Sequence, residues 1–196
     1  MTNVEVFRES DLSVDEVLAV EADHILIATG ATWRAEGFGR NQLQSLKTLK
    51  PASQIFTPDD IMAGNLPKGP TVIFDDDSFY MGGVIAEKIQ YENAPVTMVT
   101  PENIVSAWCK YTSEQYQVQK NLLKLGIHIR TAHRVLAYNG QMVTICCVHT
   151  GRQQSIEADA LVMGTARSPQ DELYQTLKRH TKNGRSNTVP FVAENR

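Results

Sequence analysis

Three consecutive aspartates, Asp75 to Asp77, lie between a short apolar run and a helix-like pattern. A nucleotide-binding fold places its glycine-rich phosphate turn at this point, between a strand and the helix that follows it. In that turn one glycine permits a tight bend, a second lets the backbone approach the pyrophosphate, and a third lets helix and strand pack closely. Aligning the turn with such motifs places Asp77, Phe79 and Gly82 at the three positions, so only the packing glycine is retained.

The charge of this turn opposes phosphate binding. At about 4 Å and an effective dielectric constant near 20, each pair of like charges costs about 4 kcal/mol. Phe79 would also fill the space through which a phosphate approaches. After the next strand, Thr100 and Pro101 stand where a ribose-binding acid is usual, with Glu102 one residue further along. We therefore expect the turn to bind no ordinary dinucleotide.

The backbone N–H groups at the start of the helix still need acceptors. The favoured explanation is that Asp77 or Ser78 is the N-cap, so that a side chain of the protein takes the place of the phosphate. A bound cation or an arginine partner for the other aspartates is the first alternative. A catalytic pair of carboxylates is the second, and it is disfavoured because no adjacent residue supplies a nucleophile or a base.

The other reactive side chains predict no catalytic or metal site. The three cysteines form an odd set without CxxC spacing, and the five histidines show neither HxxxH nor HxH spacing. Trp33 and Trp108 are predicted to pack at domain interfaces rather than to stack on a bound ring. Arg167 is predicted to lie in a solvated turn rather than on a phosphate.

Composition excludes several classes of partner. The chain has 196 residues, 42% of them hydrophobic, and a formal net charge of −3 with dispersed lysine and arginine. Nucleic acid is therefore not an expected partner. Its longest apolar runs are far shorter than the roughly 20 residues that span a bilayer, so no membrane partner is expected. The acidic, polar start does not resemble a signal peptide, and a cytoplasmic location is expected.

Strands and helices alternate from residue 71 onward. Strands are predicted at 71–74, 96–99 and 127–130, with amphipathic helices at about 80–92 and 112–125 between them. This alternation predicts a parallel sheet. A strand meander over 133–148 and 155–158, a closing strand at 161–163 and a helix at 171–180 are predicted to follow.

The first 70 residues are less regular. Strands are predicted at 4–7 and 24–28, and Ser13 with Glu16 resembles a capping box for a short helix between them. Glycine and proline are dense from residue 31 to 70, which predicts a connection. Within it, Thr57 followed by Pro58 predicts the start of a helix.

An internal repeat indicates two related domains. Residues 21–30 and 157–166 match in residue type, and each stretch ends an apolar strand in a turn of small residues. The two strands are expected to hold equivalent places in two nucleotide-binding domains.

Four stretches together resemble the C-terminal region of the trimethylamine dehydrogenase family. That family includes dimethylamine and histamine dehydrogenases and related NADH:flavin oxidoreductases with an N-terminal barrel. The stretches are ADHILIATGATWR (22–34), VIFDDDSFYMGGVIAEKI (72–89), PVTMVTPENIVSAW (95–108) and EADALVMGTARSP (157–169). The resemblance covers most of the chain and weakens after about residue 180.

The resemblance implies the two-dinucleotide-domain flavoprotein fold. Residues 66–170 would form an inserted NAD(P)-like Rossmann domain, with three layers, a parallel sheet and a β-meander. Residues 1–65 would be a partial FAD- or ADP-type domain segment with a linker, packed loosely or paired with a second copy of the chain. Residues 171–196 would be a C-terminal helix and tail.

The resemblance also implies cofactors and partners for a larger enzyme. Family members carry FMN and a cysteine-ligated 4Fe-4S cluster in segments that this sequence lacks, and ADP is a further candidate cofactor. Ala28, Thr29 and Gly30 resemble the family's turn near an adenine dinucleotide. Together with Asp77, Phe79 and Gly82 they form a vestigial or weak cofactor site, and no residue of the chain is expected to be catalytic. By itself the chain is expected to hold no cofactor.

Three functions follow from these implications. The favoured one is a degenerate nucleotide-binding domain with a structural role in an amine oxidoreductase, whose partner is the rest of that enzyme. The first alternative is an active NAD(P)H-docking domain of an NADH:flavin oxidoreductase. The second is a module that docks an electron carrier such as electron-transfer flavoprotein.

Overall fold

The computed structural model describes residues 3–46, 48–50, 54–92, 94–181 and 187–190. The chain forms two compact units, one made of Met1–Thr32 with Pro169–Arg196 and the other of Trp33–Ser168. The expected boundary near residue 65 differs from this division, because residues 33–65 belong with the second unit. A linker that contributes strands and a helix to a neighbouring sheet becomes part of that compact unit.

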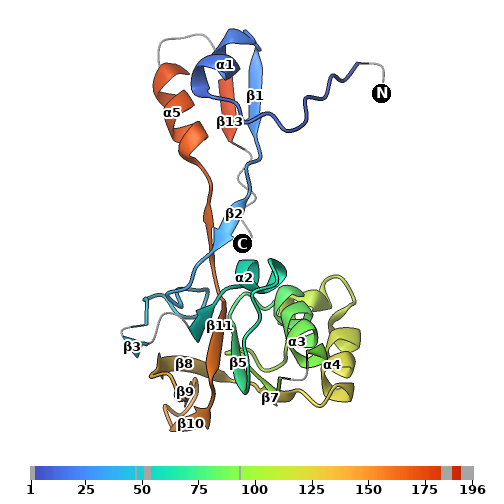
Figure 1. Ribbon diagram of the computed structural model, residues 1–196, viewed down its shortest axis with the longest axis vertical. Helices are drawn as coiled ribbons and strands as arrows, with labels where there is room; N and C mark the ends of the chain where they lie inside the picture. The colour runs from blue at the N-terminus through green and yellow to red at the C-terminus, as the bar shows by residue number, and fades with distance from the viewer. Residues whose placement is uncertain (1–2, 47, 51–53, 93, 182–186, 191–196) are drawn as a thin grey trace. The chain divides into compact units, whose positions relative to one another are not determined.

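A parallel sheet of five strands forms the middle of the second unit (Figure 1). In sheet order the strands are β4 (Ile55–Phe56), β11 (Ala160–Gly164), β5 (Thr71–Asp75), β6 (Val96–Val99) and β7 (His128–Arg130). Every neighbouring pair is parallel. The parallel sheet predicted from alternating strands and helices is therefore confirmed.

Two helices cover one face of this sheet, and Figure 1 shows them on the same side of β5. They are α3 (Met81–Tyr91) and α4 (Gln115–Lys124), and their apolar sides share a core with Ile73 and Met98 of the sheet. The second helix starts three residues later than predicted. A 3-10 helix, η2 (Ala107–Lys110), precedes it, and Ser113 has a left-handed backbone with φ of 63° that interrupts the helical path.

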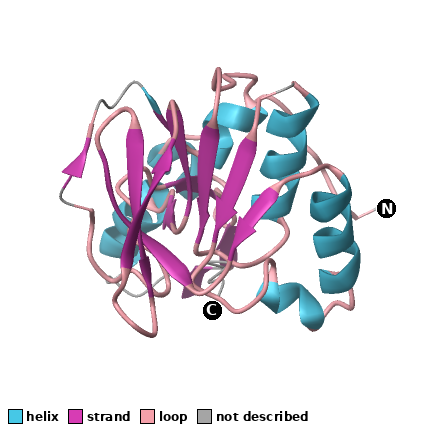
Figure 2. Cartoon of the chain, turned by 90° about the horizontal axis from the view of Figure 1, so that it is seen from below, coloured by secondary structure: helices cyan, strands magenta, loops and turns pink. Residues whose placement is uncertain are grey.

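A meander covers the opposite face. It consists of β8 (His133–Tyr138), β9 (Met142–Cys147) and β10 (Gln153–Glu157), which pair antiparallel, with β3 (Thr48–Leu49) beside β8. Because side chains alternate along a strand, Val72 and Phe74 of β5 face the meander while Ile73 faces the helices. The structure thus has the predicted three layers of a Rossmann-like α/β fold, and Figure 2 shows helices along one flank of the strands.

The predicted start of the short helix in the connection is confirmed. Thr57 caps α2 (Pro58–Met62) in a capping box with Asp60, and Pro58 takes the first helical position.

Within its described residues, the first unit contains two helices and a small parallel sheet. Its elements are α1 (Val14–Ala19), β1 (His24–Ile27), α5 (Glu172–Thr181) and β13 (Asn187–Pro190), and β1 pairs with β13. The predicted capping box of Ser13 and Glu16 is present. The strand predicted at 4–7 is wrong, because alternation makes a strand only where a partner strand supplies hydrogen bonds, and these residues pair with no described strand.

Both strands predicted from the internal repeat are present. Each leads through a short turn into a further strand, β1 into β2 (Ala31–Trp33) and β11 into β12 (Arg167–Pro169), and these two strands pair with each other. Among the described residues, no helix is long and apolar enough to cross a membrane.

Candidate functional site

The acidic turn joins the carboxyl end of β5 to the start of α3, which is where doubly wound folds bind ligands. We use the name acidic turn for residues 75–78. All four side chains are buried, and even the most exposed of them, Asp77, shows only 4% of its surface. Charged side chains are almost never buried without partners, so each of these aspartates must be hydrogen-bonded, paired with a cation or neutral.

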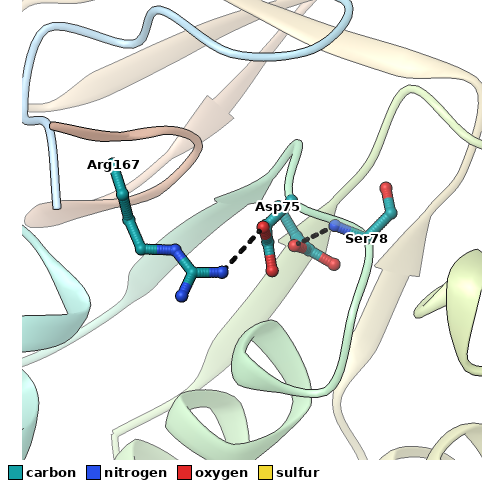
Figure 3. A network of polar contacts seen from close by, with 4 residues as sticks. Asp75, Ser78 and Arg167 are labelled. Atoms are coloured by element: carbon teal, nitrogen blue, oxygen red, sulfur yellow. Dashed lines mark hydrogen bonds and ion pairs between the residues drawn. The ribbon is translucent and has the colours of Figure 1, made fainter. Parts of the chain in front are cut away.

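Asp75 points to the helix side of the sheet. Its Oδ1 accepts a hydrogen bond of 3.0 Å from the backbone N–H of Ser78 (Figure 3), whereas its Oδ2 is buried without a partner among the described residues. A Cβ atom on Gly82 would lie 2.6 Å from the Asp75 Cγ. Gly82 therefore makes room for a carboxyl group of the protein itself.

Burial decides the protonation of Asp75. The pKa of this carboxyl is raised to about 8: loss of contact with water is the largest cause, the Ser78 N–H opposes it, and the neighbouring charges of Asp77 and Asp76 add to it. Asp75 is accordingly a neutral acid at pH 7. The repulsion expected among three charged aspartates is thereby reduced.

Asp76 points away from Asp75, toward the loop at 39–42. Its carboxylate accepts hydrogen bonds from the backbone N–H groups of Asn41 (2.9 Å) and Gln42 (3.2 Å) and from the Asn41 side-chain amide (2.8 Å). A Cβ on Gly39 would lie 2.1 Å from the Asp76 Oδ2, so a glycine is needed there. Asp76 thus holds a loop that lies 35 residues earlier in the chain.

Asp77 has an arginine partner. Its Oδ1 lies 3.4 Å from a guanidinium nitrogen of Arg167, which Figure 3 labels. The same guanidinium lies over the Trp33 ring at 4.6 Å. Burial raises the pKa of Asp77, while the charges of Arg167 and Arg40 lower it. An arginine partner was expected for the other aspartates, but the structure gives it to Asp77. Arg167 is exposed, as predicted, although it lies in strand β12 rather than in a turn.

The predicted N-cap is wrong. Helix α3 begins at Met81 after Tyr80, and no side chain caps it with a hydrogen bond among the described residues. Ser78 has a left-handed backbone with φ of 60°, which turns its N–H toward Asp75 before the helix starts. Carboxyl groups of the protein do bond the turn, because Asp75 accepts the Ser78 N–H and Asp77 accepts the backbone N–H of Phe79, but neither caps the helix.

An aromatic cluster borders the acidic turn; it consists of Phe79, Trp108 and Tyr111 with the Arg40 guanidinium. The Phe79 and Trp108 rings are stacked with centroids 6.0 Å apart, and Tyr111 is 5.6 Å from Trp108. Arg40 lies over both stacked rings at 5.3 and 5.2 Å. The backbone N–H of Trp108 also donates to the Ser78 carbonyl at 3.0 Å, so this cluster is bonded to the turn.

Of the predicted site residues, the structure places Asp77, Phe79 and Gly82 together around the acidic turn. The others, Ala28 to Gly30, lie in the first unit, where they are exposed. There the Thr29 hydroxyl donates to the Gln170 carbonyl, and the Gln170 N–H donates to the Gly30 carbonyl at 3.0 Å. These bonds hold the turn to the residues after β12.

Sequence reasoning missed the partners of the aspartates. Asn41, Gln42 and Arg40 lie in the segment that was predicted to be a mere connection, and no local pattern marks them. The hydroxyl of Thr100, at the end of β6, accepts the Glu102 N–H at 3.3 Å. Among the described residues no three histidine, cysteine, aspartate or glutamate side chains are grouped to hold a metal ion.

Comparison with known proteins identifies relatives, although no family profile matches the chain. Dimethylamine dehydrogenase from Hyphomicrobium sp. (strain x) is 23% identical over 205 residues, covering 94% of this chain and 28% of that protein. The structure of histamine dehydrogenase from Rhizobium sp. 4-9 is similar with a TM-score of 0.87 and 36% identity, covering 96% of this chain and 30% of that one.

A second solved structure gives the same result. The 6-hydroxypseudooxynicotine amine oxidase (HisD) from Pseudomonas geniculata N1 matches with a TM-score of 0.85 and 33% identity, covering 97% of this chain and 29% of that one. A water-forming NADH oxidase from Lactobacillus brevis, at 12% identity and a TM-score of 0.52, shares the fold alone. The chain spans about 30% of the length of its nearer relatives. It is therefore a homologue of the dimethylamine and histamine dehydrogenases of the trimethylamine dehydrogenase family, matching a C-terminal region of those proteins.

Proposed function

We propose that this chain is a structural portion of a larger amine-oxidising flavoenzyme and that its acidic turn binds no dinucleotide. The observation that carries the proposal is the position of the Asp75 carboxyl against Gly82. In a working turn, close helix packing leaves the backbone N–H groups free for a pyrophosphate. Here the Ser78 N–H already has an acceptor in Asp75.

Charge supports the same proposal. A dinucleotide pyrophosphate at the acidic turn would meet the buried side chains of Asp76 and Asp77. The carboxylate of Asp76 is committed to the loop at 39–42, and Asp77 has Arg167 as its partner, so neither can turn away without losing these contacts. The Phe79 side chain, which would fill the space through which a phosphate approaches, is stacked on Trp108. The residues present do not fit a dinucleotide.

Isothermal titration calorimetry tests this proposal directly. We expect wild type to give no binding heat with NADH or NADPH at millimolar concentration. Binding of NADH at micromolar concentration would overturn the proposal and favour the alternative of an active NAD(P)H-docking domain. Titration with ADP is a separate arm, because any ADP contact would involve Ala28 to Gly30 rather than the acidic turn.

For the whole enzyme we propose oxidation of a small amine. This proposal is supported by three relatives: a dimethylamine dehydrogenase, a histamine dehydrogenase and an amine oxidase. The FMN and 4Fe-4S cluster that the family resemblance implies would be held by parts of the enzyme outside this chain, and ADP is the cofactor we assign to the first unit. The chemistry that these two groups would supply to the whole enzyme is oxidation of the amine and onward transfer of its electrons.

The partner we propose is the rest of that enzyme. In the first unit, apolar side chains stand in solvent on and before β1, with Leu26 75% exposed. A parallel pair of only two strands is rarely stable without further cover. Co-expression with the remaining segments of the parent enzyme should protect the amides of His24–Ile27 from hydrogen exchange; unchanged exchange would argue against this partner.

Docking of an electron carrier is a second candidate function. The observation that favours it is the exposure of aromatic side chains beside the acidic turn. Tyr111 is 83% exposed, and Tyr80, which follows Phe79 directly in the sequence, is also exposed. Tyrosine, tryptophan and arginine are enriched in protein interfaces. Surface plasmon resonance with electron-transfer flavoprotein, comparing wild type with Tyr111→Ala, tests it; equal binding by both proteins would count against this surface.

A further inference from the structure

A chain of three bonded residues links the helix side of the sheet to the aromatic cluster. The Asp75 carboxyl accepts a hydrogen bond from the backbone N–H of Ser78, and the Ser78 carbonyl accepts one from the backbone N–H of Trp108. Ser78 holds a left-handed backbone, which is uncommon for a residue other than glycine and persists only when its surroundings impose it. The conformation of this turn therefore depends on the Asp75 carboxyl.

Apart from the backbone N–H groups of Ser78 and Asp77, which favour the ionised form, the surroundings of Asp75 favour its neutral form. Gly82 of α3, Met98 of β6 and Gly164 of β11 approach the carboxyl group, and none of them carries a charge. The titratable groups close enough for their charges to interact with it are Asp76 and Asp77 in its own turn and the buried Cys109 of η2.

The two arginines in the region are engaged elsewhere. Arg167 bonds Asp77, and Arg40 lies over Phe79 and Trp108 while its charge acts on Asp77. No cation is therefore placed to stabilise an ionised Asp75 among the described residues. The buried Oδ2 would remain without a partner once its proton was lost, unless the turn moved to admit water.

We propose that the acidic turn is a pH-dependent switch: protonated Asp75 holds Ser78 and, through it, Trp108, and loss of the proton opens the turn and releases the Trp108 segment. The input is the proton on a single carboxyl. The output is the aromatic cluster at the surface, whose packing differs between the two states. The switch involves no ligand, so it holds whether or not the turn binds nucleotides.

The sign of the effect follows from linkage. The pKa of Asp75 is raised in the folded state, so folding takes up a proton at neutral pH and stability falls as pH rises toward the folded pKa of about 8. Relative to Asp75→Asn, which is neutral at every pH, the folding equilibrium constant of wild type should fall about tenfold per pH unit between pH 5 and 8. The difference should level off above that range.

Two measurements test the proposal. Urea unfolding of wild type, Asp75→Asn and the exposed control Asp23→Asn from pH 5 to 9.5 measures how the free energy of unfolding depends on pH. Only Asp75→Asn should lose the fall in stability between pH 5 and 8. Fluorescence of Trp108 in a Trp33→Phe background reports release of the segment, with an expected midpoint near pH 8. The same background carrying Asp75→Asn should show no such transition.

Three outcomes would overturn the switch. One is the same pH profile for wild type and Asp75→Asn. Another is a pH-dependent difference in stability between wild type and Asp75→Asn without any change in Trp108 fluorescence, because ionisation of Asp75 would then not release the Trp108 segment. Should Asp75→Asn fail to fold, ¹³C NMR of the aspartate carboxyl groups in wild type decides, and titration of Asp75 below pH 6 would contradict the proposal.

Discussion

Asp75 and Asp76 are adjacent in sequence and equally buried, yet they lie in opposite environments on the two sides of one sheet edge. On the helix side, Asp75 receives one N–H and has two glycines and a methionine methyl group around it. On the loop side, Asp76 receives two backbone N–H groups and a side-chain amide. The comparison shows that the number of donors, rather than depth alone, decides how a buried carboxyl is used.

The largest expected effect comes from removing the better-bonded aspartate. Asp76→Ala leaves the donors of Asn41 and Gln42 without their shared acceptor, and we expect it to lower the free energy of unfolding by about 3 kcal/mol. Urea unfolding at pH 7 measures the change. Asp75→Asn is the matched comparison and should not lower stability at pH 7, because wild-type Asp75 must take up a proton on folding there whereas the amide is neutral in both states. Equal losses in both variants would remove the distinction between the two sides.

A smaller effect is expected on the helix side from Gly82→Ala. The added Cβ would lie 2.6 Å from the Asp75 Cγ and 2.8 Å from the Met98 methyl carbon, so we expect a loss of about 2 kcal/mol from overpacking. In an Asp75→Ala background the same substitution should cost much less. A double-mutant cycle measures this coupling. Strictly additive losses would show that Gly82 serves something other than the carboxyl.

The smallest effect is expected for the ion pair of Asp77. Its partner Arg167 has a side chain that is 34% exposed and the two atoms are 3.4 Å apart, so Arg167→Met should cost about 1 kcal/mol and less at high salt. Thermal unfolding at low and high salt measures both. A loss as large as that of Asp76→Ala would place the arginine among the main supports of the turn.

The alternating strands and helices were readable from sequence because their signals are local. The apolar period of α3 and the capping boxes at Ser13 and Thr57 involve residues within one or two turns, and the structure confirms them. The strand predicted at 4–7 was wrong for the complementary reason. A strand needs a partner, and its own pattern does not report one.

The acidic turn was only partly predictable. The sequence showed that a glycine at position 82 was kept while acidic and aromatic residues replaced the other two, and this predicted a turn unsuited to phosphate. It wrongly predicted Asp77 or Ser78 as the cap, because the hydrogen bonds of each side chain depend on the backbone of Ser78 and on the side of the sheet that each aspartate faces.

The sequence by itself determined the order of elements, the parallel sheet and the family resemblance, since these rest on periodicity and on strings of adjacent residues. Only the tertiary structure decided that Asp75 is neutral, that Asp76 holds a loop 35 residues away and that Asp77 meets an arginine 90 residues away. The physical reason is that a carboxyl's charge depends on the water and donors around it, and those are brought together by the fold from distant parts of the chain.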